Sequence, residues 1–139
     1  MRKKLIEKAV PVVLRQSAHG VEILVFEHPI AGRQLVKGSV EPNESAEDAA
    51  VRELAEESGL IGVSKTIFLG DQIYNDSAQQ WFFFRCLFDR KLPDQWEFFT
   101  QDDGGHLFKF HWRPIEDKID NPAGPIFELA REFIEKSAA

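Results

Sequence analysis

The apolar residues of this chain recur mainly in short runs, which predict β-strands separated by polar turns. The runs at 9–15 and 21–27 flank a polar segment and predict a hairpin. Pro11 predicts an edge or a bulge in the first run, because proline cannot donate a hydrogen bond within a sheet. Further strands are expected at 34–36, 63–69, 81–88, 96–99 and 107–112, with a turn at 75–77 and a second hairpin formed by the last two strands.

Helical spacing of apolar residues occurs in two segments. The first runs to Ser58, with Ser45 and Asp48 placed as in a capping box and Gly59 as the C-cap. Its apolar side is expected to consist of Ala50, Val51, Leu54 and Ala55. The second helix is expected to begin near Pro122 or Pro125 and to bury Ile126, Phe127, Leu129, Ala130, Phe133 and Ile134. Strands mixed with two helices predict an α/β domain over residues 1–139, with a mixed β-sheet between helical layers.

The composition narrows the class of protein and of partner. The 139 residues have a formal net charge of −6, which argues against binding of long nucleic acid, since that needs a basic face. The single cysteine, Cys86, excludes an internal disulfide and is expected to be a buried strand residue. No Cys/His spacing suits zinc, and no apolar run has signal or membrane length, so a cytoplasmic location without membrane contact is expected.

Three carboxylates share one surface of the first helix. Glu53, Glu56 and Glu57 stand at i, i+3 and i+4, so their side chains face the same way. Like charges so placed repel one another, and a cation between them explains the pattern better than helix stability does. Oxygen ligands alone favour Mg²⁺, with Mn²⁺ as a substitute, over zinc.

The spacing of these residues matches the Nudix box, G-x5-E-x7-R-E-U-x-E-E-x-G-U, in which U is a bulky aliphatic residue. Every defined position is filled, by Gly38, Glu44, Arg52, Glu53, Leu54, Glu56, Glu57, Gly59 and Leu60. Val36, Ser39 and Asn43 depart from common family usage, but none is a defined position. The chain therefore resembles a Nudix hydrolase, and the resemblance implies the α/β/α sandwich of that family.

The resemblance also implies roles for the box residues. Glu53 and Glu57 are the leading metal ligands, Glu56 follows them, and the Gly38 carbonyl is a further ligand. Arg52 is expected to orient carboxylates by ion pairing with Glu56 or Glu44, and Glu44 itself either supports the site or adds a metal ligand. Family members take the catalytic base from the box or from a distant loop, so Glu53 is the default and the alternatives are Glu97, Asp102, Asp103 and Glu116.

Residues beside the box bear on the substrate. The string Lys-Gly-x-Val-Glu-Pro-x-Glu, which begins at Lys37, is similar to that of Nudix enzymes acting on dinucleoside polyphosphates. Lys37 and Arg33 are candidate phosphate contacts, and Gly38 lets main chain approach the substrate closely. Trp96 is the leading base-stacking candidate; the other aromatic candidates, expected more often in the core, are Tyr74, Trp81, Phe84, Phe108 and Phe110. Structural roles are expected for His28, His106 and His111.

Three functions remain open at this point. The first is a Mg²⁺-dependent pyrophosphohydrolase of a nucleoside diphosphate linked to another moiety. Dinucleoside polyphosphates lead as its substrate, followed by nucleoside triphosphates, nucleotide sugars and RNA ends. The second is a non-catalytic module that senses a small-molecule nucleotide. The third is an interaction domain that exposes the aromatic strand at 81–88, and self-association as a homodimer through an edge strand also stays open.

Overall fold

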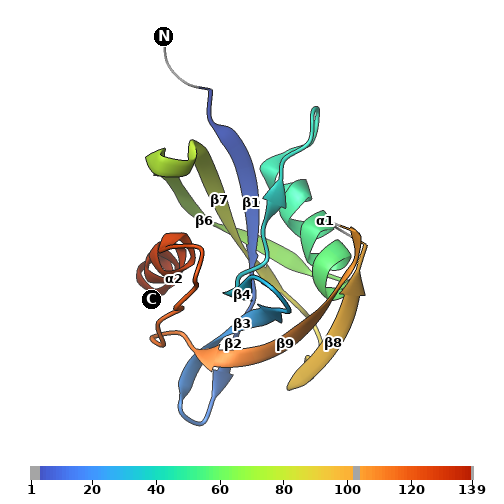
Figure 1. Ribbon diagram of the computed structural model, residues 1–139. Coiled ribbons are helices and arrows are strands. Elements are labelled where there is room, and N and C mark those ends of the chain that lie inside the picture. The colour runs from blue at the N-terminus through green and yellow to red at the C-terminus, as the bar shows by residue number, and fades with distance from the viewer. Residues whose placement is uncertain (1–3, 102–103, 139) are drawn as a thin grey trace.

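Two β-sheets lie between two helices (Figure 1). The computed structural model describes residues 4–101 and 104–138. The first sheet has the order β5-β1-β7-β6 and consists of β1 (Ile6–Val12), β5 (Gly38–Ser39), β6 (Lys65–Tyr74) and β7 (Gln79–Leu87). This sheet is mixed, because β1 runs parallel to β7 whereas the other pairs are antiparallel. The expected α/β fold with a mixed sheet is confirmed.

The second sheet is antiparallel and has the order β2-β3-β9-β8, with β4 paired to β3. Its strands are β2 (Leu14–Ser17), β3 (Gly20–His28), β4 (Gly32–Gln34), β8 (Gln95–Thr100) and β9 (His106–Pro114). The second predicted hairpin is therefore confirmed as β8 and β9, and the expected turn at 75–77 is a short 3₁₀ helix. The strand expected at 34–36 lies earlier in the chain, at β4.

The first predicted hairpin is only partly right. β2 pairs with β3 as expected, but the run at 9–15 is divided: β1 ends at Val12 and pairs with β7 in the other sheet. Pro11 is tolerated in β1 because the pairing with β5 covers only Lys8 and Ala9, so the strand has an edge at the proline. The strand expected at 63–69 is also longer, since β6 continues to Tyr74 through an irregularity between Phe68 and Gly70.

Helix α1 (Ala46–Ser58) begins and ends at the residues that the sequence predicts. The Ser45 hydroxyl accepts a hydrogen bond from the Asp48 amide, and Gly59 closes the helix in the left-handed region at φ 78°. The buried side differs in part, because Ala49 and Glu53 are buried whereas Val51 and Ala55 are half-buried. The two alanines at 49 and 50 let the helix lie close to β1 and β7.

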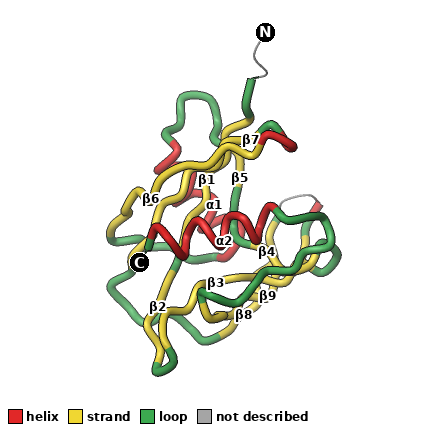
Figure 2. Tube along the Cα trace, turned by 90° about the vertical axis from the view of Figure 1, so that its left-hand side faces the viewer, coloured by secondary structure: helices red, strands yellow, loops and turns green. Residues whose placement is uncertain are grey.

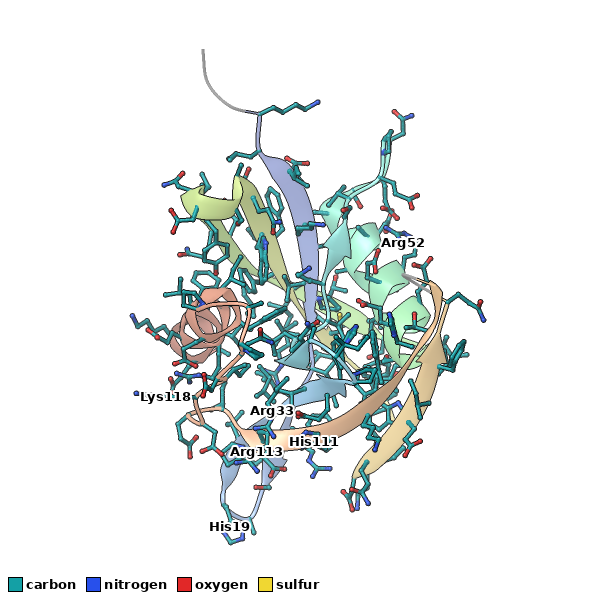
Figure 3. All side chains as sticks on the ribbon, in the orientation of Figure 1. His19, Arg33, Arg52, His111, Arg113 and Lys118 are labelled. Atoms are coloured by element: carbon teal, nitrogen blue, oxygen red, sulfur yellow. The ribbon has the colours of Figure 1, made fainter. Side chains whose placement is uncertain are left out.

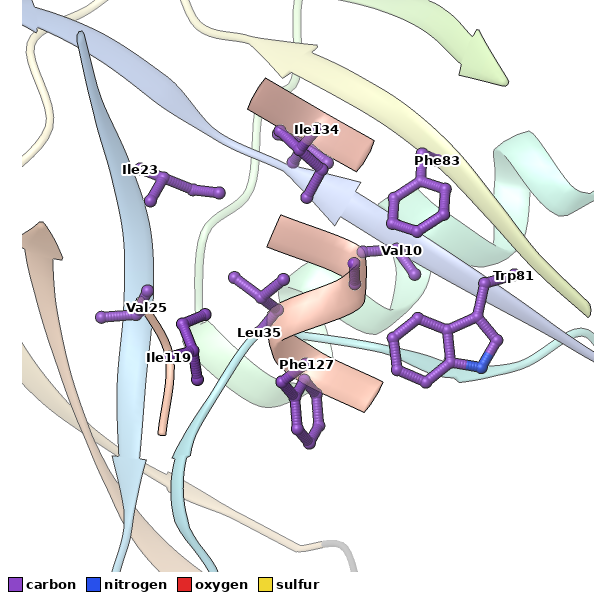
Figure 4. Close-up of a cluster of buried hydrophobic side chains, with 11 residues drawn as sticks. Val10, Ile23, Val25, Leu35, Trp81, Phe83, Ile119, Phe127 and Ile134 are labelled. Carbon is purple, nitrogen blue, oxygen red and sulfur yellow. The ribbon is translucent and has the colours of Figure 1, made fainter. Parts of the chain in front are cut away.

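Helix α2 (Ile126–Ser137) covers the opposite side, and Figure 2 shows it crossing in front of the strands. Its buried residues meet both sheets in a core that includes Val10, Ile23, Trp81, Phe83, Phe127 and Ile134 (Figure 4). Along β7, Trp81, Phe83, Phe84 and Cys86 are all buried. The aromatic strand is therefore core, which overturns its interpretation as an exposed docking surface.

Candidate functional site

The site is built where β5 meets α1. A Cβ atom added to Gly38 would lie 1.9 Å from the Cδ of Glu53 and 2.2 and 2.3 Å from its two oxygens. The glycine is therefore required by the carboxylate that packs against it, and positive φ plays no part, because Gly38 does not have one. The Glu53 side chain is 10% exposed, so its carboxylate is held at a fixed place next to the main chain of β5.

Arg52 donates hydrogen bonds to four groups of this region. Its Nε and Nη2 atoms donate to the two oxygens of Glu44 at 2.7 and 2.9 Å, which is a bidentate pair. Its Nη1 atom donates to Glu53 at 2.8 Å and to Glu56 at 3.1 Å, and Nη2 also donates to the carbonyl of Ser39 at 3.0 Å. Arg52 was expected to pair with Glu56 or with Glu44; it pairs with both, and the pairs with Glu53 and, at 3.8 Å, Glu41 are additions.

This network shifts the pKa values of Glu44 and Arg52. The hydrogen bonds from Arg52, with one from the Glu41 backbone, lower the pKa of the Glu44 carboxyl to about 2. The same contact with Glu44, followed by the contact with Glu53, raises the pKa of Arg52. Glu44 is therefore ionised throughout the neutral range, and its carboxylate faces the guanidinium of Arg52.

A pocket of about 490 Å³ opens beside this network. Four of the expected site residues line it: Lys37, Gly38, Glu53 and Glu57. The aromatic candidate Phe108 lines it as well. Further lining residues had no predicted site role, among them Lys8, His28, Ser39 and Glu41. Acidic and basic side chains thus meet in one concave site, which suits an anionic ligand held together with a cation.

The donor set fits a hard divalent cation. Glu53 and Glu57 supply carboxylate oxygens, and the space that a Cβ would fill at Gly38 brings main chain next to one of them. Glu56 does not line the pocket; its side chain is 47% exposed and bonds Arg52. Within residues 4–101 and 104–138, no three His, Cys, Asp or Glu side chains converge on a single point.

Comparison with known proteins shows the family to which the chain belongs. The NUDIX domain family matches residues 6–136, which is nearly the whole chain. The chain belongs to the Nudix family. No curated protein matches it. In the described part of the chain, neither helix has the length and apolar character needed to cross a membrane.

Several solved Nudix structures share the fold at low sequence identity. The NUDIX domain of Shewanella oneidensis NrtR, complexed with ADP ribose, matches with a TM-score of 0.68 and 15% identity over 99% of this chain and 91% of its own. A binary complex of the C. elegans Ap4A hydrolase gives 0.64 and 18%, over 94% and 95%. A MutT/nudix family protein from Enterococcus faecalis gives 0.59 and 21% over 81% of this chain, which spans 44% of that protein. At these identities the likeness shows the fold alone.

Arg33 lies apart from the Nudix box. Its Nε atom donates to Glu27 at 2.6 Å, and His111 contacts the same Glu27 oxygen at 2.7 Å. Figure 3 shows Arg33 beside His111 and away from Arg52. Arg33 does not line the pocket, so the structure gives it an ion pair between β4 and β3 in place of the expected phosphate contact.

Two of the four candidate bases outside the box, Glu97 and Glu116, are not brought to it. Glu97 and Glu116 are exposed, and neither lines the pocket. Asp102 and Asp103 lie outside the described residues. Among the candidate bases that the structure describes, Glu53 is the one that lines the pocket.

The candidates for base stacking also lie partly inside and partly outside the pocket. Trp96 packs its ring on Phe110, with centroids 5.1 Å apart and planes at 9°, and donates its Nε1 hydrogen to the carbonyl of Ser58. Its role is to fix the end of α1, and it does not line the pocket. Of the six aromatic candidates, only Phe108 lines the pocket. The sequence around Lys8 does not indicate a site role. Its side chain reaches the site because β1 pairs with β5, 31 residues further along the chain, where its Nζ donates to the Ser39 hydroxyl at 2.8 Å.

Proposed function

We propose that this Nudix domain is a Mg²⁺-dependent pyrophosphohydrolase, with Mn²⁺ as a substitute ion. Its substrate is a nucleoside diphosphate linked to another moiety, and a dinucleoside polyphosphate leads among the candidates. The observation that carries the proposal is the close approach of the Glu53 carboxylate to Gly38 in a pocket that also holds Glu57 and Lys37. This arrangement supplies oxygen ligands for a hard cation next to a positive charge for phosphate.

Each residue has a part in this chemistry. Glu53, Glu57 and the Gly38 carbonyl would hold the ion, and Glu56 is available as a further carboxylate. When bound, the ion offsets phosphate charge and lowers the pKa of a bound water. Glu53 would accept the proton of the attacking water, and Arg52 keeps its carboxylate oriented through the 2.8 Å hydrogen bond.

Two cations complete the phosphate end of the pocket. Lys37 lines it next to Gly38, and Lys8 reaches it from β1, where its Nζ donates to Ser39. Both would act as point charges on the non-bridging oxygens of a polyphosphate. The net charge of −6 makes such local cations necessary for an anionic substrate.

The choice among substrates rests on residues 37–44. Their similarity to the string in enzymes of dinucleoside polyphosphates, together with the fold shared with the C. elegans Ap4A hydrolase, favours that class. The ADP ribose in the Shewanella oneidensis NrtR complex keeps nucleotide sugars as the alternative, with nucleoside triphosphates beside them. A non-catalytic sensing module is disfavoured, because every carboxylate of the box is present.

A substrate panel tests the proposal. Dinucleoside polyphosphates, nucleoside triphosphates and nucleotide sugars are incubated with the protein and Mg²⁺, and the released phosphate and mononucleotide are quantified. We expect product from at least one class, and a loss of several orders of magnitude in Glu53→Gln and in Glu57→Gln. Glu47→Gln is the matched control, since Glu47 lies on the same helix and bonds Thr66 away from the pocket.

Two results would count against this function. Rates unchanged in both Glu53→Gln and Glu57→Gln would remove the assigned roles. Nucleotide binding without any product above the Glu53→Gln background, across the whole panel, would favour the sensing module instead.

A further inference from the structure

A buried tryptophan lies next to both lysines that line the pocket. Trp81 on β7 is fully buried and belongs to the core between the two sheets and α2. It is the register partner of Lys8 in the parallel pairing of β1 with β7. The Nζ atom of Lys37 lies over its ring, 5.8 Å from the centroid. Trp81 does not line the pocket itself, so its contact with the site runs through Lys37.

The ammonium group of Lys37 gains from a fixed anchor. Lys37 lies between β4 and β5, outside both strands, and its long side chain loses rotamer freedom when it is held in one place. Lys8 lines the same pocket, and two ammonium groups so placed repel each other. The Nζ atom of Lys8 is anchored on the Ser39 hydroxyl at 2.8 Å. A separate anchor for Lys37 keeps the second charge at the pocket.

The indole ring of Trp81 provides this anchor. The face of a tryptophan ring attracts an ammonium group within about 6 Å of its centroid, and does so more strongly than the rings of tyrosine and phenylalanine. The ring is itself held in place, because its Nε1 atom donates to Oε1 of Gln79 at 2.7 Å. Tyr74 and Phe127 contact it edge-on, with centroids 5.1 and 5.8 Å away. A ring fixed in this way gives the Lys37 ammonium a defined position.

We propose that Trp81 is a positioning residue of this site, whose ring holds the ammonium group of Lys37 in place for the phosphates of a bound nucleotide. The inference rests on the proposed function, because that function assigns Lys37 to phosphate. It gives Trp81 a role in binding in addition to its place in the core. Since Lys37 binds phosphate and takes no part in bond breaking, loss of the ring should change affinity and leave kcat nearly unchanged.

Two matched substitutions separate positioning from packing. Trp81→Leu removes the ring below Lys37, and Phe83→Leu removes a ring two residues further along the same face of β7 (Figure 4). Phe83 is also fully buried and does not line the pocket. Both variants should lose stability in urea denaturation, because each leaves a cavity in the core. Trp81→Phe is the conservative variant, and it takes the place of Trp81→Leu in every comparison if leucine prevents folding.

Dissociation constants of α,β-methylene-ADP, a nucleotide that resists hydrolysis, are measured by calorimetry in the presence of Mg²⁺. We expect Trp81→Leu to weaken binding about fivefold, which corresponds to the loss of one cation–π contact, and Trp81→Phe to weaken it about twofold. Phe83→Leu should bind the nucleotide as the wild type does. In a Lys37→Met protein, which lacks the ammonium group and binds more weakly, Trp81→Leu should cause no further loss.

Steady-state kinetics on the best nucleotide of the substrate panel give a second readout. Trp81→Leu should raise KM by about the same factor as the dissociation constant, with kcat close to that of the wild type. Phe83→Leu should leave both constants unchanged. A lower kcat with an unchanged KM in Trp81→Leu would contradict the positioning role, because the ring would then affect the reacting groups and not the binding of phosphate.

Several binding results would overturn the inference. One is an equal loss of affinity in Trp81→Leu with and without Lys37, and another is an equal loss in Trp81→Leu and Phe83→Leu, since packing alone would then explain the effect. Unchanged binding in Trp81→Leu or in Lys37→Met would refute it as well. A wild-type protein that binds no nucleotide would remove the proposed function and this inference together. A protein that hydrolyses nucleotides without coupling between Trp81 and Lys37 would refute this inference alone.

Discussion

Replacing Gly38 with alanine tests the geometry of the site with a single methyl group. The added Cβ would lie 1.9 Å from the Cδ of Glu53, whereas real Cβ contacts are essentially never shorter than 3.0 Å. The carboxylate must therefore retreat by at least about 1.1 Å, and by roughly 1.6 Å to reach an ordinary carbon–carbon separation of about 3.5 Å. Gly38 has no positive φ, so alanine adds no backbone strain and the effect is confined to this contact.

The expected result is a protein that folds but turns over slowly. A misplacement of about 1 Å in a catalytic group costs on the order of 10²-fold in rate, which is about 2.7 kcal/mol of barrier. The overpacking itself should destabilise the fold by roughly 1–3 kcal/mol. We expect Gly38→Ala to lower kcat on the best nucleotide of the panel about a hundredfold, with a modest loss in the free energy of unfolding.

Steady-state kinetics and urea denaturation are the two measurements. Gly20→Ala is the control for stability, because that glycine has positive φ and open space around it, far from the box in sequence. It should lose stability with unchanged kcat. A folded Gly38→Ala protein with wild-type kcat would refute the reasoning, because turnover would then not depend on the position of the Glu53 carboxylate next to Gly38.

Three further predictions concern Arg52, the pH dependence of its pair with Glu44, and the thiol of Cys86. Arg52→Gln should lower the free energy of unfolding in urea titrations without metal, because the carboxylates lose their shared cation. Arg52→Lys should restore little of this stability, because lysine cannot bond Glu44 in bidentate fashion, and a fully stable lysine variant would contradict the prediction. The pKa of Glu44 is lowered to about 2, so the stability from its pair with Arg52 is present above the unfolded value of about 4.5 and is lost as the pH falls towards 2. The difference in the free energy of unfolding between wild type and Arg52→Gln should accordingly shrink in denaturation series at pH 7, 5 and 3. A constant difference would contradict a stabilising pair between Glu44 and Arg52. Burial raises the pKa of the Cys86 thiol to about 12, so a thiol reagent at pH 8 should label it only after unfolding, and rapid labelling of the native protein would show that β7 is not packed as described.

Helix α1 shows which parts of the fold the sequence can predict. Its ends depend on contacts within a few residues, the Ser45 hydroxyl with the Asp48 amide and the left-handed turn at Gly59. The box spacing likewise placed Glu53 beside Gly38, because a fixed loop and helix length relate the two. The Glu27–Arg33 pair was also within reach of local reasoning, since it joins opposite positions of a short hairpin.

β1 shows why other parts of the fold cannot be predicted from the sequence. Its partner β7 lies some 70 residues away, with Ala9 opposite Phe82, and the apolar run at 9–15 gives no sign that the chain changes sheets after Val12. The same long-range pairing delivers Lys8 to the pocket. The aromatic strands posed a related difficulty, because a periodic pattern shows which residues share a face but not where that face meets a pocket.

The central claim is that this cluster of carboxylates binds a hard divalent cation for action on a phosphoanhydride. Calorimetric titration of Mg²⁺ and Mn²⁺, with and without α,β-methylene-ADP, tests it most directly. The account predicts ion binding to the wild type that is strengthened by the nucleotide, greatly weakened in Glu53→Gln and Glu57→Gln, and unchanged in Glu47→Gln. Absence of binding by either ion with the nucleotide present, or equal binding by all four proteins, would contradict it.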